Sequence, residues 1–119
     1  MRVGIDLIEV KRFENIASNS VRMSTLFGEK EIAYFDGYKD RGVHIAGCFA
    51  AKEAVAKAFK TGFNGQITPL DIEIVHKNKV PYVNLKGGAK RFFEEQCFGG
   101  IEISISHSKT DATAICIIW

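Results

Sequence analysis

The stretch that decides the fold is Phe49-Ala50-Ala51-Lys52-Glu53-Ala54-Val55-Ala56-Lys57-Ala58-Phe59. It is rich in alanine, the residue with the highest helix propensity, and its apolar residues recur at helical spacing. At about 3.6 residues per turn, one face of the helix is apolar, and it consists of Cys48, Ala51, Val55, Ala58 and Phe59. The opposite side holds Glu53, Ala56, Lys57 and Lys60. This pattern predicts a long amphipathic helix.

Glu53 and Lys57 are one turn apart on this helix, with the acid before the base. One interpretation is a solvated ion pair, which stabilises a helix by only about 0.2–0.5 kcal/mol. The other is that a carboxylate and an ammonium at this spacing hold a metal ion and a phosphate group. The helix by itself leaves both interpretations open.

Length and composition predict a single domain over residues 1–119. Hydrophobic residues make up 46% and charged residues 25%, which is typical of a soluble globular protein. The net charge of +2 is too small to indicate nucleic acid as a partner. No apolar run is long enough to cross a membrane, and Asp6 interrupts the first apolar residues too early for a signal peptide. Three cysteines without a metal-binding spacing predict free thiols in the cytoplasm; they are Cys48, Cys97 and Cys116.

The order of elements predicts the α+β class, an antiparallel sheet packed with a long central helix and shorter helices. We expect strands at 3–7, 71–75, 82–85, 101–107 and 112–119, and helices near 11–17, at 28–35, from Val43 to about Gly62 and at 90–98. Gly62 is the expected cap of the long helix. The last strand is apolar on both faces, so we expect it to be central and buried.

Two further places carry polar residues where chemistry is plausible. Asp6 interrupts an apolar strand, and a carboxylate buried there must be paired or bound to a metal. Ser104-Ile105-Ser106-His107-Ser108 is a polar strand end. Because neighbours in a strand point to opposite faces, Ser106 and His107 do not form a nucleophile–base pair. Binding of phosphate oxygens or a simple hydrogen-bonded turn are the remaining interpretations.

His44 and His76 are expected to be surface residues without a role. The segment 60–65 contains glycine and lysine, but it is not a Walker loop, so an ordinary helix-to-strand connection is the simpler interpretation.

Three segments taken together resemble a known family. They are Gly4-Ile5-Asp6-Leu7-Ile8-Glu9-Val10-Lys11-Arg12-Phe13, Phe49-Ala50-Ala51-Lys52-Glu53-Ala54-Val55-Ala56-Lys57-Ala58 and Ser104-Ile105-Ser106-His107-Ser108. In this order they are similar to the holo-acyl-carrier-protein synthases, the short branch of the 4′-phosphopantetheinyl transferases. The resemblance implies transfer of 4′-phosphopantetheine from coenzyme A to a serine of an apo acyl carrier protein in fatty acid biosynthesis. It also implies Mg²⁺, a cytoplasmic location, and a homotrimer with active sites between subunits.

Carried over by position, the resemblance implies catalytic roles for Asp6, Glu53 and Lys57, with Asp6 and Glu53 as the magnesium ligands. It implies that the carrier protein contacts Lys11 and Arg12. The positions that match coenzyme contacts are Lys57, Thr61, Gly62, Pro81, Ser106 and His107. Magnesium favours one or two carboxylates together with water and phosphate oxygens, which fits these residues. The proton of the attacking serine passes either to Glu53 or to a metal-bound water, and the sequence leaves this choice open.

The chain departs from the family pattern at several positions. Family members usually have arginine at Cys48, glycine at Lys60 and an aromatic residue at Asp111, and a glycine before Pro81. The missing arginine removes one expected phosphate contact, for which Lys52 or Lys60 is a possible replacement. Two other classes of protein fit the same sequence, a non-catalytic module that binds a carrier protein or nucleotide, and a purely structural trimer. Neither of them needs Asp6, Glu53 and Lys57 together.

Overall fold

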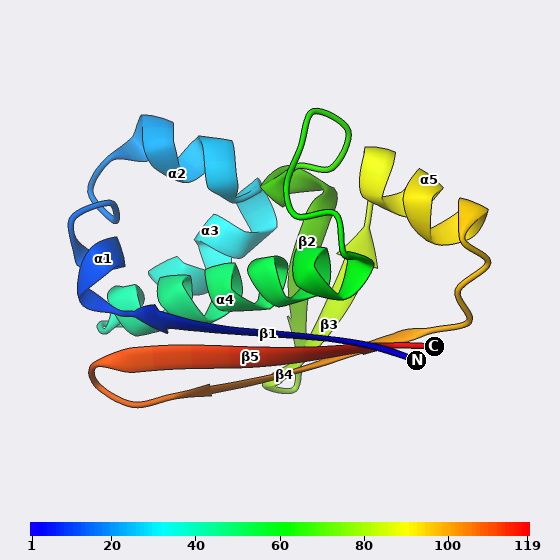
Figure 1. Cartoon of the computed structure of the whole chain (residues 1–119). Coiled ribbons are helices and arrows are strands. Elements are labelled where there is room, and N and C mark those ends of the chain that lie inside the picture. The colour runs from blue at the N-terminus through cyan, green and yellow to red at the C-terminus, as the bar shows by residue number, and fades with distance from the viewer.

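A computed structural model describes the whole chain, residues 1–119. Its centre is helix α4 (Arg41–Phe59), which begins two residues earlier than the sequence predicts. Figure 1 shows α4 lying along a three-stranded sheet, with all the other helices on the same side of that sheet. The α+β class with a long central helix is therefore confirmed. None of the helices has the length and apolar content needed to cross a membrane.

All strand pairs are antiparallel, but the strands form two sheets rather than one. The first sheet has the order β1 (Arg2–Glu9), β5 (Asp111–Ile118) and β4 (Ile101–His107). The second is the hairpin of β2 (Ile72–Lys77) and β3 (Val80–Leu85). The hairpin crosses behind α4 and lies beside β4 (Figure 1). It therefore contributes a second wall next to the central helix.

The remaining helices are short and pack on the far side of α4. They are α1 (Lys11–Glu14), α2 (Ser20–Leu26), α3 (Glu29–Asp36) and α5 (Gly87–Glu95), with a 3₁₀ turn at Pro69–Asp71. The sequence analysis missed α2 because Asn19 and Ser20 interrupt the helical pattern before it. In the structure Asn19 is the N-cap of α2, and its side chain accepts a hydrogen bond from the Arg22 backbone N–H at 3.1 Å. The interruption is therefore a start signal for a new helix.

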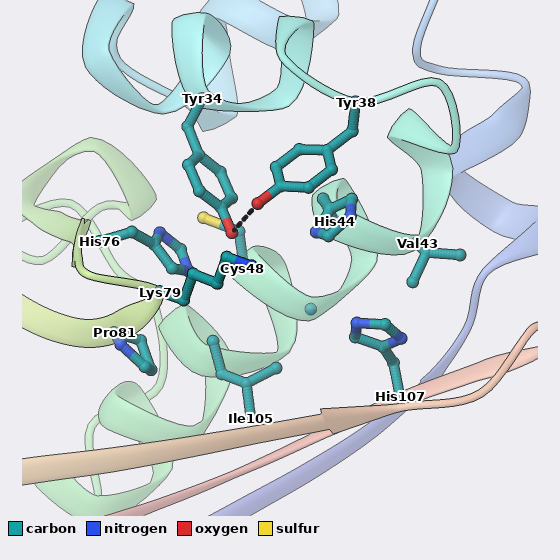
Figure 2. A pocket seen from close by; sticks show the side chains of 11 residues that line it. Tyr34, Tyr38, Val43, His44, Cys48, His76, Lys79, Pro81, Ile105 and His107 are labelled. Carbon is teal, nitrogen blue, oxygen red and sulfur yellow. Dashed lines mark hydrogen bonds between the residues drawn. The ribbon is translucent and has the colours of Figure 1, made fainter.

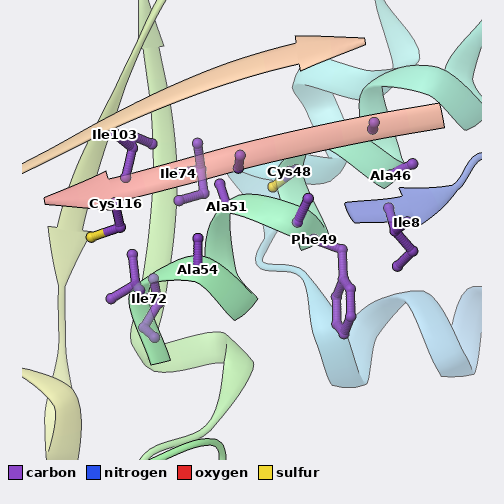
Figure 3. Packing of buried hydrophobic residues seen from close by; sticks show 14 of the residues in the cluster. Ile8, Ala46, Cys48, Phe49, Ala51, Ala54, Ile72, Ile74, Ile103 and Cys116 are labelled. Atoms are coloured by element: carbon purple, nitrogen blue, oxygen red, sulfur yellow. The ribbon is translucent and has the colours of Figure 1, made fainter. Parts of the chain in front are cut away.

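Small residues allow α4 to lie very close to β1. A Cβ atom added to Gly4 would lie 1.9 Å from the carbonyl oxygen of Ala54, so only glycine fits at this position. Ala54 and Ala58 are fully buried on the same side of the helix. Figure 3 shows this part of the core, where side chains of α4, the first sheet and β2 interlock. The close approach brings the backbone of β1, and with it Asp6, next to α4.

The C-terminal end of α4 is closed by Lys60 and not by Gly62. Lys60 is the C-cap and has a left-handed backbone with φ of 66°. Its N–H donates to carbonyl groups of the last turn. A left-handed conformation favours glycine, because other residues place Cβ close to the neighbouring carbonyl oxygen. This explains physically why a glycine is the expected residue at this position.

The outer face of the three-stranded sheet is apolar and exposed to solvent. Val3, Ile5 and Leu7 of β1 are 55%, 60% and 71% exposed, and Ile115 of β5 is 37% exposed. Val3 is paired with Ile117 and Ile5 with Ile115, so these side chains form one continuous surface. The prediction that β5 is central is confirmed, but only one of its faces is buried within the chain. A single copy of the chain therefore leaves an apolar sheet face without a cover.

Lys52 lies on the side of α4 that faces α3 and β2, and it is completely buried. Its ammonium donates to the Glu31 carboxylate at 2.9 Å and to the carbonyls of Pro69 at 2.7 Å and Ile72 at 2.9 Å. Glu31 also accepts from the Ile74 backbone N–H at 2.9 Å. Because its three hydrogens are already used inside the protein, Lys52 cannot replace a missing phosphate-binding arginine, and that suggestion is wrong. It ties α3, α4 and β2 together instead.

Candidate active site

Asp6 and Lys57 meet where β1 runs beside α4. The Lys57 ammonium donates to Asp6 Oδ1 at 3.0 Å and to the carbonyl of Ile5 at 3.0 Å. As the alternation of the strand predicts, Asp6 points toward the helix and away from the exposed face that carries Ile5 and Leu7. Its side chain is only 14% exposed, whereas that of Lys57 is 53% exposed. A largely buried carboxylate is thus paired with a cation that still contacts solvent.

Glu53 lies on the same side of α4, one turn before Lys57. No ion pair joins the two residues, because Lys57 bonds to Asp6. The solvated i,i+4 pair considered from the sequence is therefore wrong. Burial and the negative charge of Asp6 raise the pKa of Glu53 above its ordinary value, while the charges of Lys57 and Arg12 act in the opposite direction. The structure therefore brings Asp6, Glu53 and Lys57 into one electrostatically coupled cluster.

Asp6 and Glu53 are also suitable ligands for a magnesium ion. They come from a strand and a helix, and their mutual repulsion is the kind of unfavourable energy that a bound cation relieves. The structure has no cluster of three or more histidine, cysteine or acidic side chains that could bind a metal. Magnesium does not need one, because it favours one or two carboxylates and keeps several water molecules. The donor set therefore fits this ion.

Arg12 extends the cluster toward the N-terminal helices. Its guanidinium lies 5.7 Å from the ring centre of Phe13 and 5.9 Å from that of Phe49, so the side chain is held against α1 and α4. Lys11 and Arg12 are both exposed and line a shallow hollow at the end of β1 with a volume of about 450 Å³. Lys11 and Arg12 make this surface basic, and the charge of Arg12 reaches Glu53.

Thr61 and Gly62 follow directly after the end of α4. The backbone N–H groups of both residues donate to the carbonyl of Ala56, at 3.3 and 3.2 Å. The Thr61 hydroxyl donates to the carbonyl of Gly62 at 2.9 Å. Gly62 has a φ of 61°, and no atom lies within 4 Å of a Cβ placed there. The segment thus forms an open turn one helical turn beyond Lys57.

A separate pocket lies on the other side of α4 (Figure 2). Its volume is about 240 Å³, and it is enclosed by α3, the first half of α4, the β2–β3 hairpin and the end of β4. His107 and Pro81 both line it, but Asp6, Glu53 and Lys57 do not. His44 and Glu53 are nine residues apart in α4, and so are Cys48 and Lys57. Nine residues are two and a half helical turns, so the two members of each pair point in opposite directions. The chain therefore places the two groups of predicted site residues on opposite sides of one helix.

The residues that sequence reasoning missed are in this pocket. His44 and His76, which we expected at the surface, are half-buried and line it together with Tyr34, Tyr38 and Lys79. The Tyr34 and His76 rings are stacked with their centres 3.8 Å apart, and the Tyr38 and His44 rings with their centres 3.6 Å apart. No sequence pattern joins these residues, because they come from separate elements. Ser106, by contrast, points to the outer face of the sheet, where it pairs with Thr113, as the alternation of β4 predicts.

Fold and site together define an α+β enzyme with an acid–lysine cluster suited to phosphate chemistry. A sequence model of the 4′-phosphopantetheinyl transferase superfamily matches residues 2–118, so the chain belongs to that family. It is similar to the holo-[acyl-carrier-protein] synthase of Clostridium tetani, with 47% identity over 98% of this chain and 93% of that protein. The corresponding enzyme of Thermoanaerobacter sp. is 42% identical over 97% of this chain and 84% of that protein.

Solved structures give the same result. The holo-[acyl-carrier-protein] synthase of Helicobacter pylori, crystallised with coenzyme A, superposes with a TM-score of 0.83 at 29% identity and covers 98% of this chain and 99% of that one. The enzyme of Bacillus anthracis superposes with a TM-score of 0.81 at 31% identity, over 98% of this chain and 94% of that one. The resemblance read from the sequence and the prediction of a transferase are therefore confirmed.

Proposed function

We propose that this protein transfers 4′-phosphopantetheine from coenzyme A to a serine of an apo acyl carrier protein and releases adenosine 3′,5′-bisphosphate. The observation that carries the proposal is the cluster of Asp6, Glu53 and Lys57 in a chain whose relatives are holo-acyl-carrier-protein synthases. A module that only binds a carrier protein or a nucleotide has no use for this combination.

In the proposed reaction the serine oxygen of the carrier forms a bond to the phosphorus that bears pantetheine. The bond from that phosphorus to the bridging oxygen of the pyrophosphate breaks. Glu53 is suited to accept the serine proton, because its raised pKa makes it a better base than an exposed carboxylate. Lys57 is suited to stabilise or protonate the departing phosphate, because its ammonium is exposed and reaches the same corner as Asp6.

Magnesium is the proposed cofactor, and Asp6 and Glu53 are the residues that would hold it. When bound, it would supply positive charge to the pyrophosphate oxygens. The repulsion between Asp6 and Glu53 supports this assignment. Removal of either carboxylate should therefore weaken magnesium binding in the absence of any substrate.

Lys11 and Arg12 are proposed to receive the carrier protein. Both are exposed, and the charge of Arg12 acts on Glu53, so a partner that contacts them brings its serine toward the proposed catalytic cluster. An acidic partner would be attracted to this basic surface. On the coenzyme side, we propose contacts at Lys57, Thr61, Gly62, Pro81, Ser106 and His107.

The active form is proposed to be a homotrimer with sites shared between subunits. Two observations support this. The coenzyme contacts proposed at Pro81 and His107 lie across α4 from Glu53 and Lys57, so a site that uses all four needs residues from two chains. In addition, the apolar outer face of the first sheet requires a cover, and Val3, Ile5 and Leu7 provide one continuous patch for a second copy. We also propose a role in fatty acid biosynthesis, as the family resemblance implies, and a cytoplasmic location, which its three free cysteines support.

The decisive experiment incubates the purified protein with coenzyme A, Mg²⁺ and an apo carrier protein and weighs the carrier by mass spectrometry. We expect the carrier to gain the mass of phosphopantetheine. Glu53→Gln should stay folded and lose turnover, whereas the matched change Glu94→Gln on the exposed surface of α5 should leave turnover intact. Failure of the unmodified protein to add this mass would overturn the proposal, and normal turnover by Glu53→Gln would overturn the site assignment.

A further inference from the structure

The ammonium of Lys57 lies where a cation bound to Asp6 would also have to lie. It donates to Asp6 Oδ1 at 3.0 Å and to the carbonyl of Ile5 at 3.0 Å. Both acceptors belong to β1, and Lys57 comes from the last turn of α4, which runs alongside that strand (Figure 1). Lys57 is therefore the counter-ion of Asp6 within the chain itself.

Glu53 brings a second carboxylate to the same corner. It forms no ion pair of its own, because the only ammonium at this corner that contacts a carboxylate is bonded to Asp6. Burial and the charge of Asp6 raise the pKa of Glu53, and the charges of Lys57 and Arg12 oppose this. The ammonium of Lys57 thus serves two carboxylates and contacts only one of them.

Lys57 is able to leave Asp6, as a comparison with Lys52 in the same helix shows. The Lys52 side chain is fully buried, and its ammonium donates to three acceptors inside the protein. The Lys57 side chain is 53% exposed and has two acceptors. A lysine ammonium is a point charge on a flexible stem, and an ion pair that is open to solvent on one side is held weakly. Lys57 can therefore exchange Asp6 for another anion at small cost.

A metal ion on Asp6 and the Lys57 ammonium would disturb one another. The two oxygens of one carboxylate are close together, so a cation on either oxygen would face the ammonium at short range. Like charges repel most where water screens them least, and the Asp6 side chain is only 14% exposed. Because Lys57 has solvent or another anion as an alternative, it is the group that gives way.

We propose that Lys57 and a divalent cation compete for Asp6, so that metal binding releases the Lys57 ammonium to bind a phosphate group. The identities of the metal and of the phosphate rest on the proposed function, which makes them magnesium and a phosphate of coenzyme A or of adenosine 3′,5′-bisphosphate. Asp6 and the phosphate are then alternative partners of one ammonium. Each ligand that draws Lys57 away from Asp6 favours the other, and this effect is reciprocal.

The competition gives Lys57 a task before the chemical step. While its ammonium is on Asp6, the carboxylates bind a metal ion less tightly. When a phosphate group attracts the ammonium, Asp6 becomes fully available. The role proposed for Lys57 at the departing phosphate also requires an ammonium that is not bound to Asp6. One movement of one side chain therefore prepares the metal site and the phosphate site together.

The first experiment follows the mobility of lysine side chains by NMR relaxation of their Cε signals while magnesium chloride is added to the protein without substrate. The Lys57 signal is identified by its loss in Lys57→Met. Lys52, which is buried, and Lys90, which is exposed on α5, are internal references for a rigid and a free side chain. We expect Lys57 to be more restrained than Lys90 before magnesium is added, and as mobile as Lys90 at saturation.

Calorimetric titration with magnesium chloride measures the competition directly. Lys57→Met removes the ammonium and keeps most of the stem, so it should bind magnesium about three- to tenfold more tightly than the unmodified protein. The control Lys60→Ala removes a nearby charge that forms no ion pair, and it should change the affinity by less than about twofold. Saturating adenosine 3′,5′-bisphosphate should tighten magnesium binding more in the unmodified protein than in Lys57→Met.

Each outcome decides one question. Magnesium that binds without a change in the mobility of Lys57 overturns the competition, and so does a Lys57→Met variant that binds magnesium no more tightly than the unmodified protein. A protein that binds no magnesium without substrate overturns it as well. The carrier mass assay on the same sample tests the proposed function separately. Release of Lys57 by magnesium in a protein that transfers no phosphopantetheine supports the competition and overturns the function.

Discussion

The ammonium of Lys57 lies 3.0 Å from the carboxylate of Asp6, across 51 positions of sequence. This ion pair joins the last turn of α4 to the first strand and replaces the helical pair with Glu53 that the sequence suggested. Its formation depends on the close contact between Gly4 and Ala54, which sets the distance between the strand and the helix. The relationship defines the corner of the molecule where we expect the reaction to occur.

Replacement of Lys57 should affect the reaction and not the fold. Lys57 is half-exposed but pairs with the largely buried Asp6, so Lys57→Ala should lower the melting temperature by a few degrees and leave the protein folded. Because its charge would no longer stabilise the departing phosphate, we expect kcat/KM to fall by about a hundredfold. The carrier mass assay measures this, with Lys90→Ala in α5 as a control. A rate within a factor of two of the unmodified protein would rule out the proposed role.

Glu53→Gln should make the protein more stable at neutral pH in the absence of metal. The pKa of Glu53 is raised above its ordinary value of 4.5 by burial and by Asp6. The folded protein therefore holds this proton more tightly than the unfolded chain does, and the resulting stability is present below pH 4.5 and is lost as the pH rises through the higher folded pKa. At pH 7 the ionised carboxylate is thus a cost that glutamine removes.

Thermal unfolding at pH 4 and pH 7 in the presence of a chelator tests this. The gain in melting temperature for Glu53→Gln should be larger at pH 7 than at pH 4. Magnesium should raise the melting temperature of the unmodified protein, because it binds only the folded state, and it should do so less for the variant. A variant that is destabilised equally at both pH values would contradict the electrostatic account.

Lys60→Gly should stabilise the protein, because the left-handed conformation at the end of α4 suits glycine. The expected gain in the free energy of unfolding is about 0.5–1 kcal/mol, after allowance for the greater freedom of glycine in the unfolded chain. Urea denaturation measures it. Lys60→Ala removes the same charge but keeps the strain, so it should show no such gain.

Binding of the carrier protein should weaken as salt increases, because an acidic partner on Lys11 and Arg12 is held partly by charge. Arg12→Gln should lower the affinity and make it less sensitive to salt. Arg22→Gln, which changes an exposed arginine on α2, is the matched control. Calorimetric titrations at low and high salt check this, and an affinity independent of salt would exclude the assigned surface.

A charge on the bare sheet face should break the proposed assembly. Ile5 is 60% exposed in the single chain, and Ile5→Lys should convert trimers to monomers in light-scattering measurements. Val21, which is 72% exposed on α2, provides the control Val21→Lys, and this change should leave the trimer intact. Because the proposed active site needs two chains, the monomeric variant should also lose transfer activity. A fully active monomer would refute the shared site.

Local sequence signals were sufficient for most elements, whereas Asp6, Glu53 and Lys57 were singled out together only through the resemblance to a known family. Alternation in β1 placed Asp6 on the face opposite Ile5, and the alanine-rich pattern located α4. They were insufficient where a single residue has two meanings. Asn19 interrupts one helical pattern and is the N-cap of the next helix. Lys60 has a left-handed backbone conformation, which a lysine in the sequence does not predict.

The histidine pocket could not be predicted, because His44, His76 and His107 belong to three elements and share no spacing. His44 and His76 each resemble an ordinary surface residue, and His107 stands out only as part of a polar strand end. The same is true of Lys52, whose sequence position suggests solvent and whose actual partners are carbonyl groups of a distant turn.

The sequence by itself determined the α+β class and the central helix, because these depend on local periodicity, and its resemblance to a known family singled out Asp6, Glu53 and Lys57. Only the tertiary structure decided which charges pair, which face of the first sheet is left bare, and that the imidazoles gather on the side of α4 opposite Glu53. These features depend on how elements far apart in the chain pack. Packing distances such as the one between Gly4 and Ala54 are set by all the neighbouring side chains together.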